Sequence, residues 1–148
     1  MDEYFMKIAL DEALKAFEED EVPIGAVVVR EGEIISKAHN LRESLNDPTA
    51  HAEIIAIREA AEKLSSWRLI DCNLYVTIEP CPMCAGAIVQ SRIKRLIYGA
   101  KDPKAGAVDS VMNIVDNPNL NHSVEVTSGI LQYECSNIMK EYFRGKRK

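Results

Sequence analysis

The sequence lacks a long apolar run, and it has no basic and then apolar segment at its N-terminus. No stretch approaches the roughly 18 to 20 consecutive apolar residues that a membrane span needs, and the N-terminus is acidic where an export signal is basic and then apolar. The chain has four cysteines, which are expected to stay reduced in a protein that is not exported. We therefore expect a cytoplasmic protein without a membrane partner, whose cysteines bind metal or pack in the core.

The compositional extremes of disordered, collagen-like and disulfide-scaffold proteins are also absent. Apolar residues make up 47% of the chain and charged residues 28%, which are ordinary values for a globular protein. A length of 148 residues suits one domain, and no repeat or linker divides the chain. We expect residues 1–148 to form a single domain.

Positive charge is in short supply, with a formal net charge of -5, which taken alone disfavours a nucleic-acid partner. The distribution of charge changes that interpretation. Residues 1–21 carry a local charge of -6, so residues 22–148 carry +1. Basic residues gather at 92–95, at 101–104 and in the tail at 144–148. A local RNA-facing patch is compatible with this pattern, although a solvated face is the simpler interpretation of any one cluster.

Apolar periodicity and turn residues predict alternating helices and strands. Helical spacing predicts helices at 2–19, 82–91, 108–115 and 130–143. Strands are predicted at 25–30, 34–39, 74–78, 95–98 and 124–127, the first two joined by a turn at Glu31-Gly32. Asp47-Pro48 predicts the start of another helix, capped by Asp47 and running to about Leu64. This order predicts an α/β fold with one mixed sheet and helices on both sides.

Two short motifs place metal-binding side chains near helix starts. The first is Thr49-Ala50-His51-Ala52-Glu53, and the second is Glu79-Pro80-Cys81-Pro82-Met83-Cys84. Two cysteines three apart at a helix start can direct both sulfurs to one ion, and the helix dipole favours the thiolate. Zinc accepts sulfur and imidazole ligands in a tetrahedron, and three protein ligands leave one position for water. The motifs therefore predict a catalytic zinc held by His51, Cys81 and Cys84.

Glu53 is the candidate proton carrier. It stands two residues from His51, close enough to serve the same water without ligating the metal. Replacing an amine with an oxygen on an aromatic ring requires an activated water and a neutral leaving group. Zinc lowers the pKa of bound water towards about 7, and a carboxylate can take the released proton and pass protons to the ring and to the departing ammonia. The set predicts a hydrolytic deaminase of a nucleobase ring.

Each motif has a plainer interpretation when it stands alone. Cys-x-x-Cys at a strand-helix junction is also typical of a thioredoxin-like redox pair or a structural zinc module, and His-x-Glu alone is weaker still. Their combination, with no other local ligand set, favours catalytic zinc. Cys72 and Cys135 are expected to be packed apolar residues. Trp67 is expected in the core, and not as a base-stacking platform.

The motifs resemble those of the bacterial tRNA-specific adenosine deaminases, within the cytidine deaminase-like zinc deaminases. The similar segments span most of the chain: residues 21–27, 39–40, 47–53 and 79–87. The stretch from Tyr98 to Ala107, with Asn121-His122 beyond it, resembles the tRNA branch specifically. The resemblance implies a three-layer α/β/α cytidine deaminase-like fold, one zinc per subunit of a homodimer, and hydrolysis of adenosine to inosine at the wobble position of a tRNA anticodon.

The same resemblance implies the substrate contacts. Asn40 is expected to hydrogen-bond the flipped nucleoside. The other contacts are three residues that wall the base pocket, Val22, Ile24 and Ala26, and three that meet the RNA loop, Asp102, Phe143 and Arg144. A base in a single-stranded loop can be extruded at little unstacking cost, so the expected partner is the tRNA anticodon stem-loop.

A deaminase of a free base or nucleoside, such as guanine or cytosine, stays open as the alternative, because such enzymes share the fold and the metal. The basic tail at 144–148 disfavours this alternative only weakly.

Overall fold

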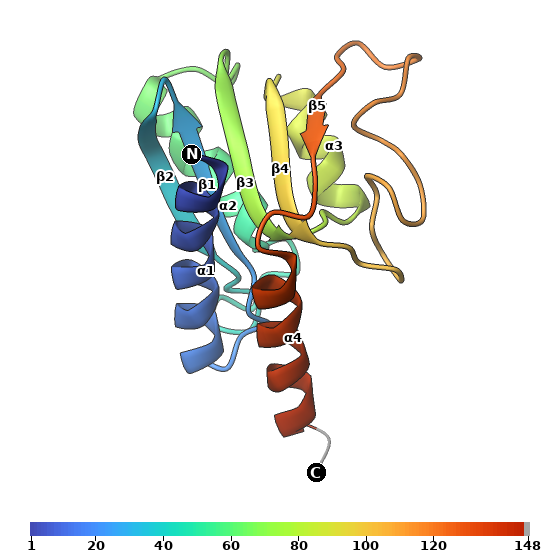
Figure 1. Ribbon diagram of the computed structural model, residues 1–148. Helices are drawn as coiled ribbons and strands as arrows, with labels where there is room; N and C mark the ends of the chain where they lie inside the picture. Colours follow the sequence, from blue (N-terminus) through green and yellow to red (C-terminus); the bar gives the residue numbers. More distant parts are fainter. Residues whose placement is uncertain (147–148) are drawn as a thin grey trace.

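The computed structural model describes residues 1–146, which form a five-stranded sheet flanked by four helices (Figure 1). The elements in chain order are α1 (Asp2–Glu18), β1 (Gly25–Arg30), β2 (Glu33–His39), α2 (Ala52–Leu64), β3 (Cys72–Ile78), α3 (Pro82–Gln90), β4 (Arg95–Ala100), β5 (Glu125–Thr127) and α4 (Gln132–Lys146). The last two residues of the basic tail, Arg147 and Lys148, lie outside the described residues. Within residues 1–146, no helix is both long and apolar enough to cross a membrane.

The sheet is mixed, as predicted. Its strand order is β2-β1-β3-β4-β5, with β1 antiparallel to β2 and β3, and with β4 parallel to β3 and β5. The predicted turn between β1 and β2 is confirmed, and Glu31 and Gly32 both have positive φ, 51° and 77°, as a tight hairpin turn requires. Parallel strands need a crossover connection, and α3 makes it between β3 and β4.

The helices cover both faces of the sheet, which confirms the three-layer α/β/α prediction. Helices α1 and α4 lie on one face, and α2 and α3 lie on the other (Figure 1). Side chains alternate between the faces along a strand, and β1 shows this directly. Ala26 and Val28 pack in the cluster beneath α2 and α3, whereas Val27 and Val29 pack in the cluster beneath α1. The valine-rich strand is therefore buried on both sides.

Helix α2 begins five residues later than Asp47, so its predicted start is wrong. The cap residue is His51, in extended backbone conformation. Asp47 instead forms a turn, in which its Oδ1 accepts hydrogen bonds from the backbone N–H of Thr49 at 2.8 Å and from its hydroxyl at 2.7 Å. Asp-Pro dipeptides favour turns as well as helix starts, and here the turn prevails. The predicted end at Leu64 is confirmed.

The helix predicted at 108–115 is not formed. In a helix over these residues, the backbone N–H groups of Met112 and Ile114 would donate to the carbonyls of Val108 and Ser110, but they donate to those of Gly106 and Ala107 instead. The N–H groups of Val108, Asp109 and Ser110 donate to the carboxylate of Glu79. A side chain from another part of the chain thus determines the conformation of this loop.

Trp67 is 57% exposed, so its predicted place in the core is wrong. It follows the end of α2, and the guanidinium groups of Arg68 and Arg92 lie 4.5 Å and 5.8 Å from its ring centroid. Cation–π contact of this kind stabilises an exposed aromatic ring. Cys72 and Cys135 are fully buried, as predicted.

Candidate metal and catalytic site

Two helix starts meet beyond the C-terminal end of β3 and bring three metal-binding side chains together. His51 is the cap residue of α2, and Cys81 is the cap residue of α3. The Nδ1 atom of His51 lies 3.6 Å from Sγ of Cys81 and 3.5 Å from Sγ of Cys84. All three donor atoms lie within 4.8 Å of one another. The structure therefore assembles one ligand set from motifs about thirty residues apart.

The spacing of these donor atoms fits a zinc ion. Zinc lies about 2.0–2.1 Å from imidazole nitrogen and about 2.3 Å from thiolate sulfur, and tetrahedral bond angles then separate nitrogen from sulfur by about 3.6 Å. The two observed separations, 3.6 Å and 3.5 Å, agree with this value. A set of one imidazole and two sulfurs is also the chemistry that zinc prefers. The three residues could hold zinc without rearrangement.

The ligands interact strongly even as bare side chains. Hydrogen bonds from Cys84 and then from His51 lower the pKa of the Cys81 thiol to about 4. The same contact with Cys81, together with burial, raises the pKa of Cys84. The hydrogen bond to Cys81 also raises the pKa of His51. Cys81 is thus a thiolate at neutral pH, the form in which cysteine binds metals.

Glu53 lies in the first turn of α2 beside this ligand set. Its side chain is buried, with 3% of the residue exposed. Burial, followed by the charge of Cys81, raises the pKa of its carboxyl to about 7. The carboxyl group therefore lies in weakly polar surroundings, next to the atoms that would hold the metal.

Asn40, at the end of β2, lies against two of the residues expected to wall the base pocket. Its side-chain Nδ2 donates to the carbonyl of Val22 at 3.4 Å, and its backbone N–H donates to the carbonyl of Ile24 at 3.2 Å. Ala26 is fully buried and packs in the same core cluster as Ala52 of α2. The structure thus groups Asn40, Val22 and Ile24, and it places Ala26 deeper, within the core.

The three expected RNA contacts lie on two other elements. Asp102 is in the loop after β4, where its Oδ1 accepts hydrogen bonds from the backbone N–H groups of Lys104 and Ala105. Phe143 and Arg144 are exposed near the end of α4. Their contact with RNA stays a prediction.

Sequence reasoning missed roles for Glu21 and Glu79. The carboxylate of Glu79 accepts hydrogen bonds from four backbone N–H groups in the 102–110 loop and from the Ser110 hydroxyl. Burial alone would raise the pKa of Glu79, but these hydrogen bonds outweigh it and lower the pKa to about 2. The signal that could have found both residues is an acidic residue at the border of an apolar strand, with proline one or two positions further on.

The fold and the ligand set together define a class, the hydrolytic deaminases with a cytidine deaminase-like fold. Residues 1–147 match the family model of the MafB19-like deaminases, and the chain belongs to this family.

Individual relatives show which deaminases this chain is similar to. The chain is 52% identical over 147 residues to the tRNA-specific adenosine deaminase of Bacillus subtilis (strain 168), covering 99% of this chain and 91% of that protein. A solved structure from work on A-to-I editing by tRNA:A34 deaminases at the wobble position is 51% identical, with a TM-score of 0.88 over 91% of this chain and 98% of that one. A guanine deaminase from Nitrosomonas europaea is more distant, at 25% identity and a TM-score of 0.82 over 95% and 83%. The resemblance predicted from the motifs is confirmed.

Proposed function

We propose that the protein converts adenosine to inosine at the wobble position of a tRNA anticodon, releasing ammonia. The main support for this proposal is the cluster of His51, Cys81 and Cys84 beside the buried Glu53. The relatives of the chain include tRNA-specific adenosine deaminases. The cluster supplies the chemistry of hydrolytic deamination, and the relatives indicate the substrate.

His51, through Nδ1, and the two cysteine sulfurs would hold one zinc ion per subunit. When bound, zinc would supply a water molecule activated for attack on the purine ring at neutral pH. The protein contributes a prearranged ligand set: Cys81 caps α3 and Cys84 lies in its first turn, where the positive end of the helix dipole favours thiolates. Because the donor atoms already have the required separations, little reorganisation is needed when the metal binds.

Glu53 would move the protons. From its place in the first turn of α2, its carboxylate would take one proton from the attacking water and pass it to the adjacent ring nitrogen. It would then take the second proton, from the hydroxyl formed on the ring carbon, and pass it to the exocyclic nitrogen as the carbon–nitrogen bond breaks. Ammonia can then leave as a neutral molecule. A buried carboxyl group suits this role, because bulk water does not compete for the protons that it carries.

Substrate recognition would involve two groups of residues outside the metal site, one around the base and one facing the RNA loop. Asn40 would hydrogen-bond the flipped nucleoside, with Val22 and Ile24 against the base and Ala26 behind them. The half-buried Asp102 and the exposed Phe143 and Arg144 would meet the RNA loop, as the resemblance to the tRNA branch implies. The same resemblance supports a homodimer. A tRNA substrate supports a cytoplasmic location. Residues 1–148 would act as one domain.

The direct test uses zinc-loaded protein and an RNA anticodon stem-loop with adenosine at the wobble position. Inosine should accumulate there, as detected by mass spectrometry or by sequencing, and a stem-loop with guanosine at that position serves as the control. Absence of inosine would reject the proposal.

A deaminase of free guanine or cytosine is the second candidate, since the guanine deaminase from Nitrosomonas europaea shares the fold. Offering the free bases and the stem-loop in parallel decides between the two. Faster turnover of a free base would favour the second candidate.

A further inference from the structure

Glu21 is a buried carboxylate that joins two loops away from the metal ligands. It lies between α1 and β1 and is 0% exposed. Its Oε1 accepts a hydrogen bond from the backbone N–H of Glu43 at 3.0 Å, and its Oε2 accepts from the backbone N–H and the hydroxyl of Ser44, both at 2.6 Å. Burial would raise the pKa of Glu21, but the hydrogen bonds from Ser44 and Glu43 outweigh it and lower the pKa. The 19–24 loop is thereby tied to the 40–51 loop.

These two loops carry the residues that face the substrate in the proposed function. Val22 follows Glu21 directly, and Asn40 opens the second loop. The amide of Asn40 is oriented by one contact from each loop: its Nδ2 donates to the carbonyl of Val22 at 3.4 Å, and its Oδ1 accepts from the backbone N–H of Arg42 at 3.2 Å. A contact at 3.4 Å is long for a hydrogen bond, so it depends on the loops keeping their separation.

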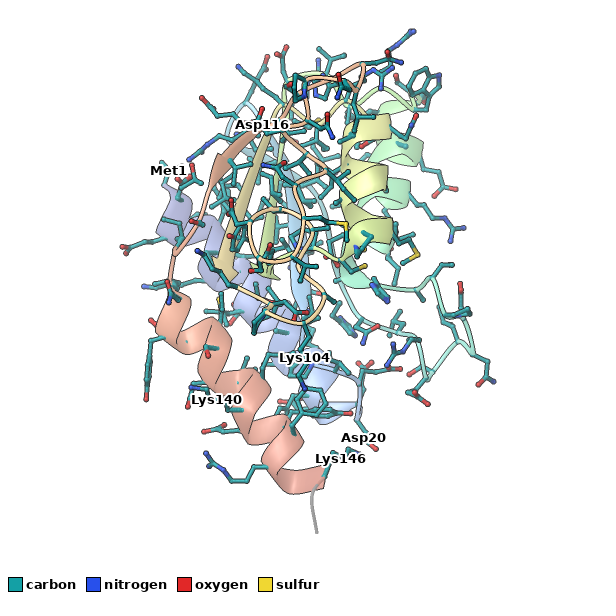
Figure 2. All side chains as sticks on the ribbon, turned by 90° about the vertical axis from the view of Figure 1, so that its right-hand side faces the viewer. Met1, Asp20, Lys104, Asp116, Lys140 and Lys146 are labelled. Atoms are coloured by element: carbon teal, nitrogen blue, oxygen red, sulfur yellow. The ribbon has the colours of Figure 1, made fainter. Side chains whose placement is uncertain are left out.

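The first loop is also anchored from its other side, by α4. Asp20 has a left-handed backbone, with φ of 60°, and its carbonyl accepts a hydrogen bond from the hydroxyl of Tyr142 at 3.2 Å. Its carboxylate pairs with Lys146, and Figure 2 shows these two labelled residues at the same end of the molecule. Residue 20 is thus held by α4, and the backbone N–H of Asn40 donates to the carbonyl of Ile24 in the first loop. The bonds of Glu21 add a second tie between the loops, three to four residues further along the 40–51 loop.

We infer that Glu21 is a positioning residue for the target base: its carboxylate fixes the spacing between Val22 and Asn40, and so the alignment of the base for attack. This inference rests on the proposed function, which places the nucleoside against those two residues. A misplacement of about 1 Å can lower a reaction rate about 100-fold. The effect should fall on kcat and spare RNA affinity, because Asp102, Phe143 and Arg144 lie on other elements.

The test compares three variants with the wild type. Glu21→Gln keeps the shape of the side chain but turns an N–H₂ group towards groups that are themselves donors. Ser44→Ala removes only the hydroxyl donor and leaves the two backbone donors in place. Glu43→Gln is the matched control, because it makes the same charge change in the neighbouring loop at an exposed side chain. Each protein is assayed for zinc content, for single-turnover rate on the stem-loop, and for Kd with the guanosine stem-loop.

Glu21→Gln should lower the single-turnover rate about 10- to 100-fold, and Ser44→Ala should lower it less. Kd should stay within about twofold of the wild-type value, and zinc content and the Glu43→Gln control should be unchanged. A wild-type rate in Glu21→Gln, or an equal loss of rate and RNA affinity, would overturn the inference. If Glu21→Gln does not fold, the test rests on Ser44→Ala. A wild-type single-turnover rate in Ser44→Ala would then overturn the inference.

The activity of the wild-type protein tests the proposed function separately from the role of Glu21. A wild-type protein that deaminates a free base and leaves the RNA intact contradicts the proposed substrate. The ratio of variant to wild-type rates on that base then decides whether Glu21 positions it.

Discussion

The buried glutamates Glu53, Glu21 and Glu79 differ in what surrounds their carboxyl groups. Glu53 is buried beside the metal ligands, and burial raises its pKa to about 7. Glu21 and Glu79 are equally buried, but each accepts several hydrogen bonds, and for both the bonds outweigh burial and lower the pKa. Desolvation favours the neutral form of a carboxyl group, whereas hydrogen bonds to the anion favour the charged form. One residue type is therefore suited to carry protons in one place, as we propose for Glu53, and to anchor loops in the others.

Replacing Glu53 with Gln should leave the metal in place and remove proton transfer. The amide has nearly the same shape but cannot accept and return a proton, so the deamination rate should fall about 10²- to 10⁴-fold. Zinc content by elemental analysis should equal that of the wild type. An unchanged rate would exclude Glu53 from the mechanism.

Replacing Cys81 with Ser should lower the zinc content itself, because a hydroxyl is a poor zinc ligand beside an imidazole and a thiolate. Cys72→Ser is the control, since Cys72 is buried in the core cluster and lies outside the group of three donor residues. Zinc per protein should fall well below one in the first variant and stay near one in the second. A normal zinc stoichiometry in Cys81→Ser would show that the ligand set is misassigned.

The chemistry-bearing residues were predictable from the sequence, and the supporting ones were not. His51, Cys81 and Cys84 stand in spacings that zinc chemistry constrains, and the structure brings their donor atoms together. Glu21 and Glu79 are two acidic residues among 23, and the proline that follows each of them marks the border of a strand without indicating which groups donate to the carboxylate. Their roles depend on donors 22 or more positions away, which only the folded chain brings near.

Regular elements followed the sequence pattern closely, whereas the loops did not. The apolar strands, the hairpin at Glu31-Gly32 and the helices around them obey short-range rules of periodicity and turn chemistry. The segment at 108–115 has helical periodicity, but its first three N–H groups bond to Glu79, and those of Met112 and Ile114 bond to the carbonyls of Gly106 and Ala107 instead of those one turn back. A hydrogen-bond acceptor from a distant part of the sequence thus overrides the local helix propensity. Rules based on neighbouring residues cannot predict such an acceptor.

Two glycines should respond in opposite ways to substitution with alanine. A Cβ at Gly106 would lie well inside van der Waals contact with the Glu79 carboxylate, so Gly106→Ala should lower the free energy of unfolding by about 1–3 kcal/mol. Gly86 lies inside α3 with nothing near the added Cβ, so Gly86→Ala should raise it by about 0.5–1 kcal/mol. Urea denaturation measures both. A Gly106→Ala variant as stable as the wild type would contradict the tight seating of the 102–110 loop.

The contact between α1 and β2 should make stability depend on pH. The Nδ1 and Nε2 atoms of His39 lie 3.0 Å and 3.1 Å from carboxylate oxygens of Glu12 and Glu19. Burial would lower the pKa of His39, but the hydrogen bonds to Glu12 and Glu19 outweigh it and raise the pKa above its usual value. For Glu12, hydrogen bonds from His39 and Lys15 likewise outweigh burial and lower the pKa.

The raised pKa of His39 stabilises the fold fully below the unfolded-state value of about 6.5, and this contribution is lost as pH rises through the folded-state value. The lowered pKa of Glu12 contributes above about 4.5 and is lost as pH falls below that value. The contact should therefore stabilise most between about pH 4.5 and pH 6.5. Urea titrations from pH 6 to pH 9 should show a shallower decline for His39→Gln than for the wild type. Equal slopes would contradict a charged His39.

At the scale of the whole molecule, the layer architecture was predictable because the order of elements restricts it. A hairpin followed by a strand-helix-strand unit gives a mixed sheet, and apolar strands require helices on both faces. Which side chains remain outside is a different matter. Trp67 is exposed just beyond the end of α2, where the guanidinium groups of Arg68 and Arg92 lie over its ring, and the contact with Arg92 joins positions that no short-range pattern relates.

The central position of β3 has a consequence for how the molecule opens. This strand lies between β1 and β4, and nearly all of its residues are buried, so its amide protons should exchange only when the whole domain unfolds. In native-state deuterium exchange, β3 should be the slowest segment, and the edge strands β2 and β5 should be faster. Cys81 follows β3 after only two residues, so half of the metal-binding thiols are attached to the segment that opens last. If the amides of β3 stay protected from exchange after zinc is removed with a chelator, the sheet holds the His51, Cys81 and Cys84 site in shape without the ion.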